Sequence, residues 1–221
     1  MLQLIKRALP DRAYPMRVVR GPFRGARVMM NPRVSLRKAF GLYEHELNAW
    51  LERALDQVSR VLDVGANDGY FTFGCAAALH RRGREASIVA FEPQRRHVEQ
   101  LAAAARHHVP GIDIEIIPAM VGKVAGEGTT TLDARQGERD RTLIKIDVEG
   151  AEVDVIEGAQ SWLRPSNLFL IEVHRRPYLD VLVQRFASRG LALVRVDQRP
   201  LPVLGREARD AENWWLVSKL G

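Results

Sequence analysis

The fold is decided by the stretch Val61-Leu62-Asp63-Val64-Gly65-Ala66-Asn67-Asp68-Gly69-Tyr70. Its first four residues predict a short buried strand, and the alanine-rich pattern from Tyr70 to Arg82 predicts a helix after it. Gly65 and Gly69 let the connecting backbone turn sharply and come close to a ligand that a Cβ atom would keep away. The stretch therefore predicts a strand–loop–helix unit in which the free N–H groups of the helix N-terminus face a bound group.

Downstream of this unit, short apolar runs alternate with helical patterns, which is the signature of a mostly parallel sheet covered by helices. The predicted strands are Val61–Val64, Ser87–Phe91, Ile112–Ile117, Leu143–Ile146, Leu168–Val173, Leu191–Val196 and Trp214–Val217, and the predicted helices are Tyr70–Arg82, Arg95–His107, Ala151–Leu163 and Tyr178–Arg189. Only a loop with Pro200 and Pro202 separates the last two strands, so they should pair antiparallel. We expect an α/β fold: a Rossmann-like, seven-stranded, mostly parallel sheet with an antiparallel terminal hairpin and helices on both faces.

The segment before residue 59 predicts a small cap on this core. Met16 to Met30 indicates two strands around Gly21-Pro22, and Tyr43 to Val58 indicates an amphipathic helix. A length of 221 residues fits one domain. We therefore expect a single domain over residues 1–221, with an N-terminal cap over 1–58 and a Rossmann-like core over 59–221.

The composition is that of an ordinary globular protein, with 46% hydrophobic and 27% charged residues. No apolar run approaches the roughly 18 residues needed to cross a bilayer, and no secretory signal is expected. The single cysteine, Cys75, cannot form an internal disulfide, which favours a cytoplasmic location, and we expect it to pack in the core. The net charge of +6 comes from arginines scattered along the sequence, so a nucleic-acid partner is disfavoured.

The second predicted strand ends at Glu92, about 20 residues after the glycine loop, where an acid can accept hydrogen bonds from two ribose hydroxyls. Dinucleotide-binding folds share this pattern, but their G-x-G-x-x-G loop has a second glycine that admits a pyrophosphate. Asn67 occupies that position here. The loop therefore favours a ligand with a ribose and a carboxylate but no phosphate, and it disfavours a nicotinamide-dependent oxidoreductase. A Walker-type P-loop is absent from the sequence, which argues against a kinase or ATPase.

Three segments carry a family resemblance: VLDVGANDGYFT (residues 61–72), AFEPQ (90–94) and LIKIDVEGAEVDVIEGA (143–159). They resemble the FkbM-like methyltransferases, a branch of the class I enzymes that depend on S-adenosylmethionine, and the likeness covers about residues 40 to 175. The resemblance implies methyl transfer from S-adenosylmethionine, often to a hydroxyl oxygen of a sugar or secondary metabolite. We therefore expect a small-molecule acceptor, with methylation of RNA and a non-catalytic cofactor-binding module as alternatives.

The resemblance also implies a set of cofactor-binding residues. The methionine side would be lined by Asp63, Gly65, Ala66, Asn67, Gly69 and Tyr70. Glu92 would hold the ribose, and Met120 would contact the adenine ring by packing alone. Asp68 departs from the family, which usually has an apolar residue there, and we expect its side chain to cap the helix that follows.

Asp147 and His174 follow two strands that should be neighbours, at the sheet edge where open α/β folds bind ligands. We expect His174 to act as a general base and Asp147 to orient the acceptor or favour the sulfonium charge, with Glu149 and Glu152 as further candidates. Lys145 should pair with one of the carboxylates. Each of these residues also has a purely structural interpretation. Asp147 could cap the following helix, and Glu152 could be the acidic residue of its first turn. His174 could be an ordinary surface histidine. No metal ligand is assigned. An Mg²⁺ or Mn²⁺ site of Asp147, Glu172 and His174 stays a less favoured alternative.

Overall fold

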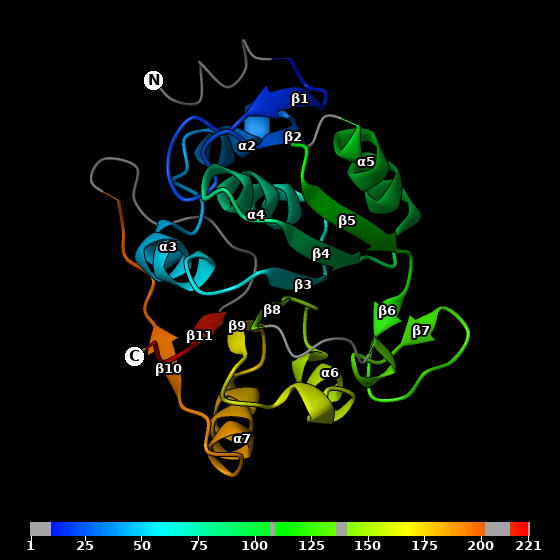
Figure 1. Cartoon of the computed structure of the whole chain (residues 1–221), viewed down its shortest axis with the longest axis vertical. Coiled ribbons are helices and arrows are strands. Elements are labelled where there is room, and N and C mark those ends of the chain that lie inside the picture. Colours follow the sequence, from blue (N-terminus) through cyan, green and yellow to red (C-terminus); the bar gives the residue numbers. More distant parts are fainter. Residues whose placement is uncertain (1–9, 107–108, 136–140, 202–212, 221) are drawn as a thin grey trace.

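The computed structural model describes residues 10–106, 109–135, 141–201 and 213–220, without the side chain of Val34. Its central feature is a seven-stranded sheet in the order β10-β11-β9-β8-β3-β4-β5 (Figure 1). The strands are β3 (Arg60–Val64), β4 (Ala86–Phe91), β5 (Ile112–Ile117), β8 (Thr142–Ile146), β9 (Leu168–Val173), β10 (Leu193–Val196) and β11 (Trp214–Ser218). The first five run parallel, whereas β11 pairs antiparallel with both β9 and β10. The predicted mostly parallel sheet with an antiparallel terminal hairpin is confirmed.

The register aligns the carboxyl ends of the central strands. Val64 at the end of β3 lies between Phe91 of β4 and Ile146 of β8. The loops that follow these strands therefore start side by side, and they carry the glycine turn, Glu92 and Asp147 to one edge of the sheet.

Helices cover both faces of the sheet, as predicted (Figure 1). On one face lie α3 (Asn48–Leu55), α4 (Tyr70–Arg81) and α5 (Arg95–Ala105), and on the other lie α6 (Glu152–Glu157) and α7 (Arg176–Ala187). Each face has its own apolar core, because side chains alternate between the two faces along each strand. Cys75 is fully buried in the core on the α4 face. Among the described residues, no helix combines the length and the apolar character that a membrane span requires.

The N-terminal segment packs on α4. Its elements are β1 (Tyr14–Arg17), β2 (Arg27–Met30), α2 (Pro32–Ala39) and the 3₁₀ turn η1 (His45–Leu47). The predicted hairpin is confirmed, but the helix predicted from Tyr43 begins only at Asn48, and α2 was not predicted. The ring of Phe23 meets those of Tyr70 and Phe71 edge to face, at 5.3 and 5.6 Å between centroids.

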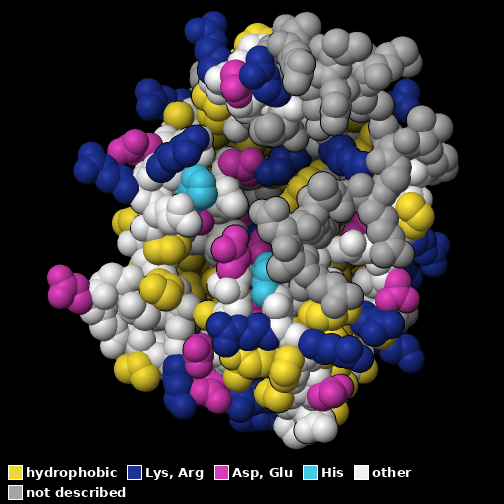
Figure 2. Space-filling view, turned by 180° about the vertical axis from the view of Figure 1, so that it is seen from behind, with side chains coloured by type: hydrophobic (Ala, Val, Ile, Leu, Met, Phe, Trp, Pro, Cys, Tyr) yellow, Lys and Arg dark blue, Asp and Glu magenta, His cyan; other side chains and the backbone are white. Residues whose placement is uncertain are grey.

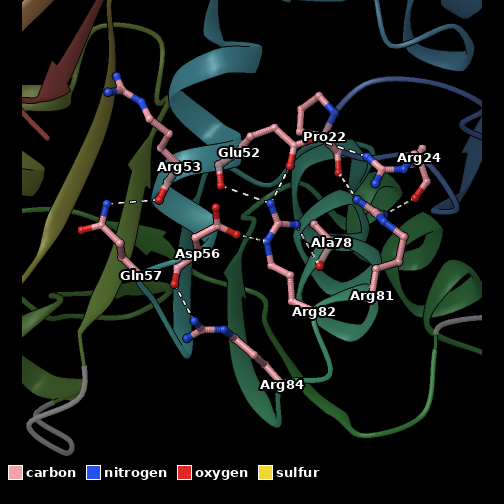
Figure 3. A network of polar contacts seen from close by, with 10 residues as sticks. All are labelled: Pro22, Arg24, Glu52, Arg53, Asp56, Gln57, Ala78, Arg81, Arg82 and Arg84. Atoms are coloured by element: carbon pink, nitrogen blue, oxygen red, sulfur yellow. Dashed lines mark hydrogen bonds and ion pairs between the residues drawn. The ribbon is translucent and has the colours of Figure 1, made fainter.

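Arginines at the end of α4 connect it to α3 and to the cap (Figure 3). Arg82 forms ion pairs of 2.5 Å with Glu52 and 2.6 Å with Asp56, both from the α3 region. Arg81 donates a hydrogen bond of 2.7 Å to the carbonyl oxygen of Pro22. Several of the arginines that make the net charge positive are thus used in structural contacts.

The helix predicted over Ala151–Leu163 is wrong in length, because α6 ends at Glu157 and a separate 3₁₀ turn, η3 (Gln160–Trp162), follows. Gly158 separates them: a Cβ atom there would lie 2.1 Å from the carbonyl oxygen of Gly122. Asp133 then caps η3 by accepting 2.9 Å hydrogen bonds from the backbone N–H groups of Gln160 and Ser161.

The connection before β8 forms a short parallel ladder of β6 (Met120–Val121) and β7 (Thr129–Thr130), followed by the 3₁₀ turn η2 (Asp133–Arg135). The predicted end of the α5 helix at His107, part of this connection (136–140) and Pro202 lie outside the described residues.

Candidate cofactor and acceptor site

A cavity opens at the carboxyl ends of the parallel strands, where open α/β sheets bind their ligands. Its walls come from the loops after β3, β4, β5 and β8 and comprise Val64, Gly65, Asn67, Phe91, Glu92, Pro93, Gln94, His97, Ala119, Met120, Val121, Asp147, Val148, Glu149 and Ala151.

The glycine loop forms one wall of the cavity. Gly65 has φ of 80°, and a Cβ atom on it would lie 1.9 Å from the carbonyl oxygen of Asp147. Only glycine therefore fits between β3 and the loop after β8. Asn67 also adopts a left-handed conformation, with φ of 50°, and its side chain stands where a pyrophosphate-binding loop has glycine.

Glu92 lies directly against this loop in the cavity wall and is only 4% exposed. Its two carboxylate oxygens accept hydrogen bonds of 2.8 Å from the backbone N–H groups of Asn67 and Gln94. Each carboxylate oxygen can accept a further hydrogen bond, so Glu92 still has capacity for two hydroxyl donors. Nδ1 of His97 lies 3.6 Å from Glu92 and has no hydrogen-bond partner among the described residues.

The structure divides the predicted cofactor-binding residues into two groups. Gly65, Asn67, Glu92 and Met120 line the cavity, whereas Asp63, Ala66, Gly69 and Tyr70 lie behind it. Asp63 is fully buried and accepts a 2.5 Å hydrogen bond from Thr72, so it supports the loop from within. Direct contact of this second group with a cofactor stays a prediction.

The sequence interpretation missed several lining residues, notably Gln94, His97 and Ala119. Only His97 could have been identified from the sequence, because it lies in the first turn of α5, which closely follows Glu92 at the end of β4. Alanine and valine carry no chemical signature that identifies a lining position.

The N-cap residue of α4 is Gly69, but the side chain of Asp68 serves the helix start as expected: its Oδ1 accepts a hydrogen bond of 3.1 Å from the backbone N–H of Tyr70. Oδ2 forms a 2.5 Å ion pair with Lys38 of α2. The ammonium group of Lys38 also lies over the rings of Tyr43 and Tyr70. The N-terminal segment therefore contacts the glycine loop directly.

Lys145 lies behind the cavity and pairs with two carboxylates, which confirms the expected pairing. Its Nζ atom is 3.1 Å from Asp147 and 3.3 Å from Asp63, and it donates a 2.8 Å hydrogen bond to the carbonyl oxygen of Gly65. Burial alone would lower the pKa of Lys145, but the charges of Asp147 and Asp63 outweigh it and hold the pKa well above its ordinary value. Burial conversely raises the pKa of Asp147, and the charge of Lys145 brings it below the ordinary value.

Asp147 does not cap α6, whose N-cap residue is Ala151. It approaches His174 instead, with 3.7 Å between its Oδ1 and the Nε2 atom of the ring. Nδ1 of His174 forms a 2.7 Å hydrogen bond with Glu152, which is fully buried in the first turn of α6. Burial would lower the pKa of His174, but the hydrogen bond to Glu152 and the charge of Asp147 raise it above the ordinary value.

Glu172 completes this group at the end of β9 and is 5% exposed. It accepts a hydrogen bond from the side chain of Asn213. Ligand atoms of Asp147, Glu172 and His174 all lie within 4.8 Å of one another. The structure thus brings Asp147 and His174 together as predicted, and Glu149 lines the cavity beside them.

The methyltransferase FkbM domain model matches residues 127–190, a segment that includes Asp147, Glu152 and His174. Similar solved structures are an rRNA methylase from Streptococcus thermophilus (14% identity, TM-score 0.53, 79% of this chain and 95% of that chain) and the METTL16 MTase domain (13%, 0.51, 83% and 76%). A precorrin-6y C5,15-methyltransferase from Geobacter metallireducens is similar at 11% identity and a TM-score of 0.50 over 78% of this chain and 88% of that chain. At these identities the likeness concerns the fold. None of the curated proteins compared with the chain matches its sequence.

Proposed function

Because the chain is an FkbM-like methyltransferase of the class that depends on S-adenosylmethionine, we propose that it methylates a hydroxyl oxygen of a small molecule. One observation supports this proposal most: Asp147 lines the cavity at the strand ends and also lies in a cluster with His174 and Glu172. A single residue therefore joins a cofactor cavity to a set of groups able to bind and activate an acceptor.

The residues that line the cavity suit S-adenosylmethionine. Asn67 stands where a pyrophosphate-binding loop has glycine, and the loop from Gly65 to Asn67 can approach a methionyl carboxylate closely. Glu92 has spare acceptor capacity for two ribose hydroxyls. Met120 is 52% exposed at the cavity and offers an apolar surface to an adenine ring. When bound, the cofactor supplies a methyl group on a positively charged sulfur atom.

The acceptor end is formed by Asp147, His174 and Glu149. Methyl transfer is a direct displacement: the acceptor oxygen loses its proton and bonds the methyl carbon, the carbon–sulfur bond breaks, and the sulfonium becomes a neutral thioether. Positioning provides much of the rate in such a step, and removal of the hydroxyl proton provides the rest. We place Asp147 and His174 at the accepting oxygen, with Glu149 at the rim of the cavity.

RNA is the competing acceptor, because the chain has a net charge of +6 and a similar fold occurs in an rRNA methylase. Figure 2, however, views the molecule from behind relative to Figure 1 and shows basic side chains distributed over this face with acidic ones among them. Arg82, the C-cap residue of α4, is also engaged in structural ion pairs. A small acceptor needs to contact only the edge of the cavity and no extended basic surface. The mixed charges on the surface therefore favour a small molecule over RNA as the acceptor.

An acceptor screen tests the proposal. The full chain would be incubated with S-adenosylmethionine and either hydroxylated small molecules or RNA, and release of S-adenosylhomocysteine would be measured. We expect turnover with a hydroxyl compound and little effect of salt. Turnover with RNA that falls steeply with salt concentration would favour RNA methylation instead. Cofactor binding without turnover on either panel would favour a non-catalytic module.

A further inference from the structure

The group of buried and half-buried side chains beside the cavity holds more acidic than basic residues. Its carboxyl groups belong to Asp63, Asp147, Glu152 and Glu172, and its basic groups belong to Lys145 and His174. Lys145 is already shared between Asp63, Asp147 and the carbonyl oxygen of Gly65. Buried carboxylates are costly unless they are paired or bind a metal. A cation bound among these carboxyl groups would therefore be stabilised by their charge.

The orientation of His174 narrows where this cation would sit. A hydrogen bond to the Glu152 carboxylate places a proton on Nδ1, so the neutral ring has its lone pair on Nε2. Nε2 faces Oδ1 of Asp147 at 3.7 Å, beyond hydrogen-bond distance. In the neutral ring, one cation placed between Nε2 and this oxygen can bind both atoms. A histidine held by a carboxylate through its other nitrogen is the usual arrangement of metal-binding histidines.

Two further observations point to a ligand here. Glu152 is fully buried, and its Oε2 atom has no hydrogen-bond partner among the described residues. Ligand oxygens of Asp147 and Glu172 lie within 4.8 Å of each other, and Glu172 is only 5% exposed. A bound cation would offset the repulsion between two carboxylates this close. Asp147 uses Oδ2 for Lys145, which leaves Oδ1 directed at His174.

We propose that Asp147, Glu172 and His174 bind a divalent cation of the Mg²⁺ or Mn²⁺ type, supported by Glu152 behind His174. Two carboxylate oxygens and one imidazole nitrogen, with no thiolate, suit such a cation. The side chains of Asp147 and His174 are 27% and 20% exposed, so the site is open on one side. Asp147 also lines the cavity, so the site borders it.

This proposal deepens the proposed function and rests on it for the role of the cation. A hydroxyl oxygen bound to a divalent cation is more acidic than a free one. The acceptor would release its proton to solvent water, and its oxygen would then bond the methyl carbon as the carbon–sulfur bond breaks. In this arrangement His174 is a metal ligand, and no imidazole base is required.

Binding of Mn²⁺ to the full chain, with S-adenosylhomocysteine and without acceptor, tests the proposal. Electron paramagnetic resonance of free Mn²⁺ gives the affinity, and the spin-echo signal shows whether a ¹⁴N nucleus is a ligand. We expect one site with a ¹⁴N signal in the wild type. Affinity should fall at least tenfold in Asp147→Asn and Glu172→Gln, and about 10–100-fold in Glu152→Gln, which removes a supporting contact. His174→Gln should lose the ¹⁴N signal.

Asp154→Asn is the matched control, because Asp154 is an exposed carboxylate on the same helix as Glu152. It should bind Mn²⁺ as the wild type does. A wild-type protein that binds S-adenosylhomocysteine but no Mn²⁺ at millimolar concentration would overturn the metal site and leave the cofactor assignment standing. Equal Mn²⁺ affinity in the wild type and in a folded Asp147→Asn protein would also overturn it. Mn²⁺ binding without S-adenosylhomocysteine binding would support the metal site and contradict the proposed function.

Discussion

The ammonium group of Lys145 donates a hydrogen bond of 2.8 Å to the carbonyl oxygen of Gly65. This contact joins the middle of β8 to the first residue of the glycine loop. The same ammonium group balances Asp63 beneath the loop and Asp147 at the cavity, so one buried cation fixes both walls. The glycine loop and Asp147 are therefore parts of one electrostatic unit.

Replacing Lys145 with methionine should destabilise the protein by about 3–5 kcal/mol, because Asp63 and Asp147 would lose their buried counter-charge. Urea unfolding followed by circular dichroism gives the change in free energy. Lys123→Met is the matched control, since Lys123 pairs with Glu157 on the exposed surface and should change stability little. Equal stability of the two variants would show that Lys145 has no special electrostatic role.

Gly65→Ala should destabilise the protein by more than about 3 kcal/mol, at the high end for a single substitution. The new Cβ atom would collide with the carbonyl oxygen of Asp147, and the positive φ adds strain. Gly83→Ala has a similar φ of 66° but nothing within 4 Å of the added atom, so it should cost only about 1–2 kcal/mol. If both variants unfold at the same urea concentration, the close approach of the two loops is not a constraint.

Asp147→Asn and His174→Ala should keep the wild-type affinity for S-adenosylhomocysteine and lose turnover. Loss of a group that deprotonates or activates an acceptor typically lowers the rate about 10²–10⁴-fold. Calorimetry gives the affinity, and release of S-adenosylhomocysteine gives kcat once an acceptor is known. Asp154→Asn serves as the exposed control. Near-normal kcat in both site variants would place the acceptor elsewhere.

The sequence predicted β5 and β9 to the residue, because their apolar runs end at Pro118 and at the polar residue His174. It also placed Asp147 and His174 on adjacent strand ends, since parallel strands of such a sheet share one edge. It did not predict the early end of α6. That end depends on the contact of Gly158 with Gly122, some 36 positions earlier in the numbering, and local helical periodicity carries no information about it.

The partners of His174 were also beyond sequence reasoning. Glu152 was interpreted as a first-turn acid, and it does accept a hydrogen bond of 2.8 Å from the backbone N–H of Gly150. Its second contact, with His174, depends on how α6 lies over the end of β9. Likewise, the pairing of Asp68 with Lys38 requires the position of α2, a helix that the apolar pattern did not reveal.

The central claim is that Glu92 and the glycine loop hold S-adenosylmethionine, and a calorimetric comparison of two variants tests it most directly. S-adenosylhomocysteine should bind the wild type, and Glu92→Gln should raise its Kd about tenfold or more, because charge-assisted hydrogen bonds are each worth roughly 1.5–3 kcal/mol. Glu99→Gln, an exposed acid on α5, should bind like the wild type, and NAD should not bind. An unchanged Kd in Glu92→Gln, or tighter binding of NAD than of S-adenosylhomocysteine, would contradict the account.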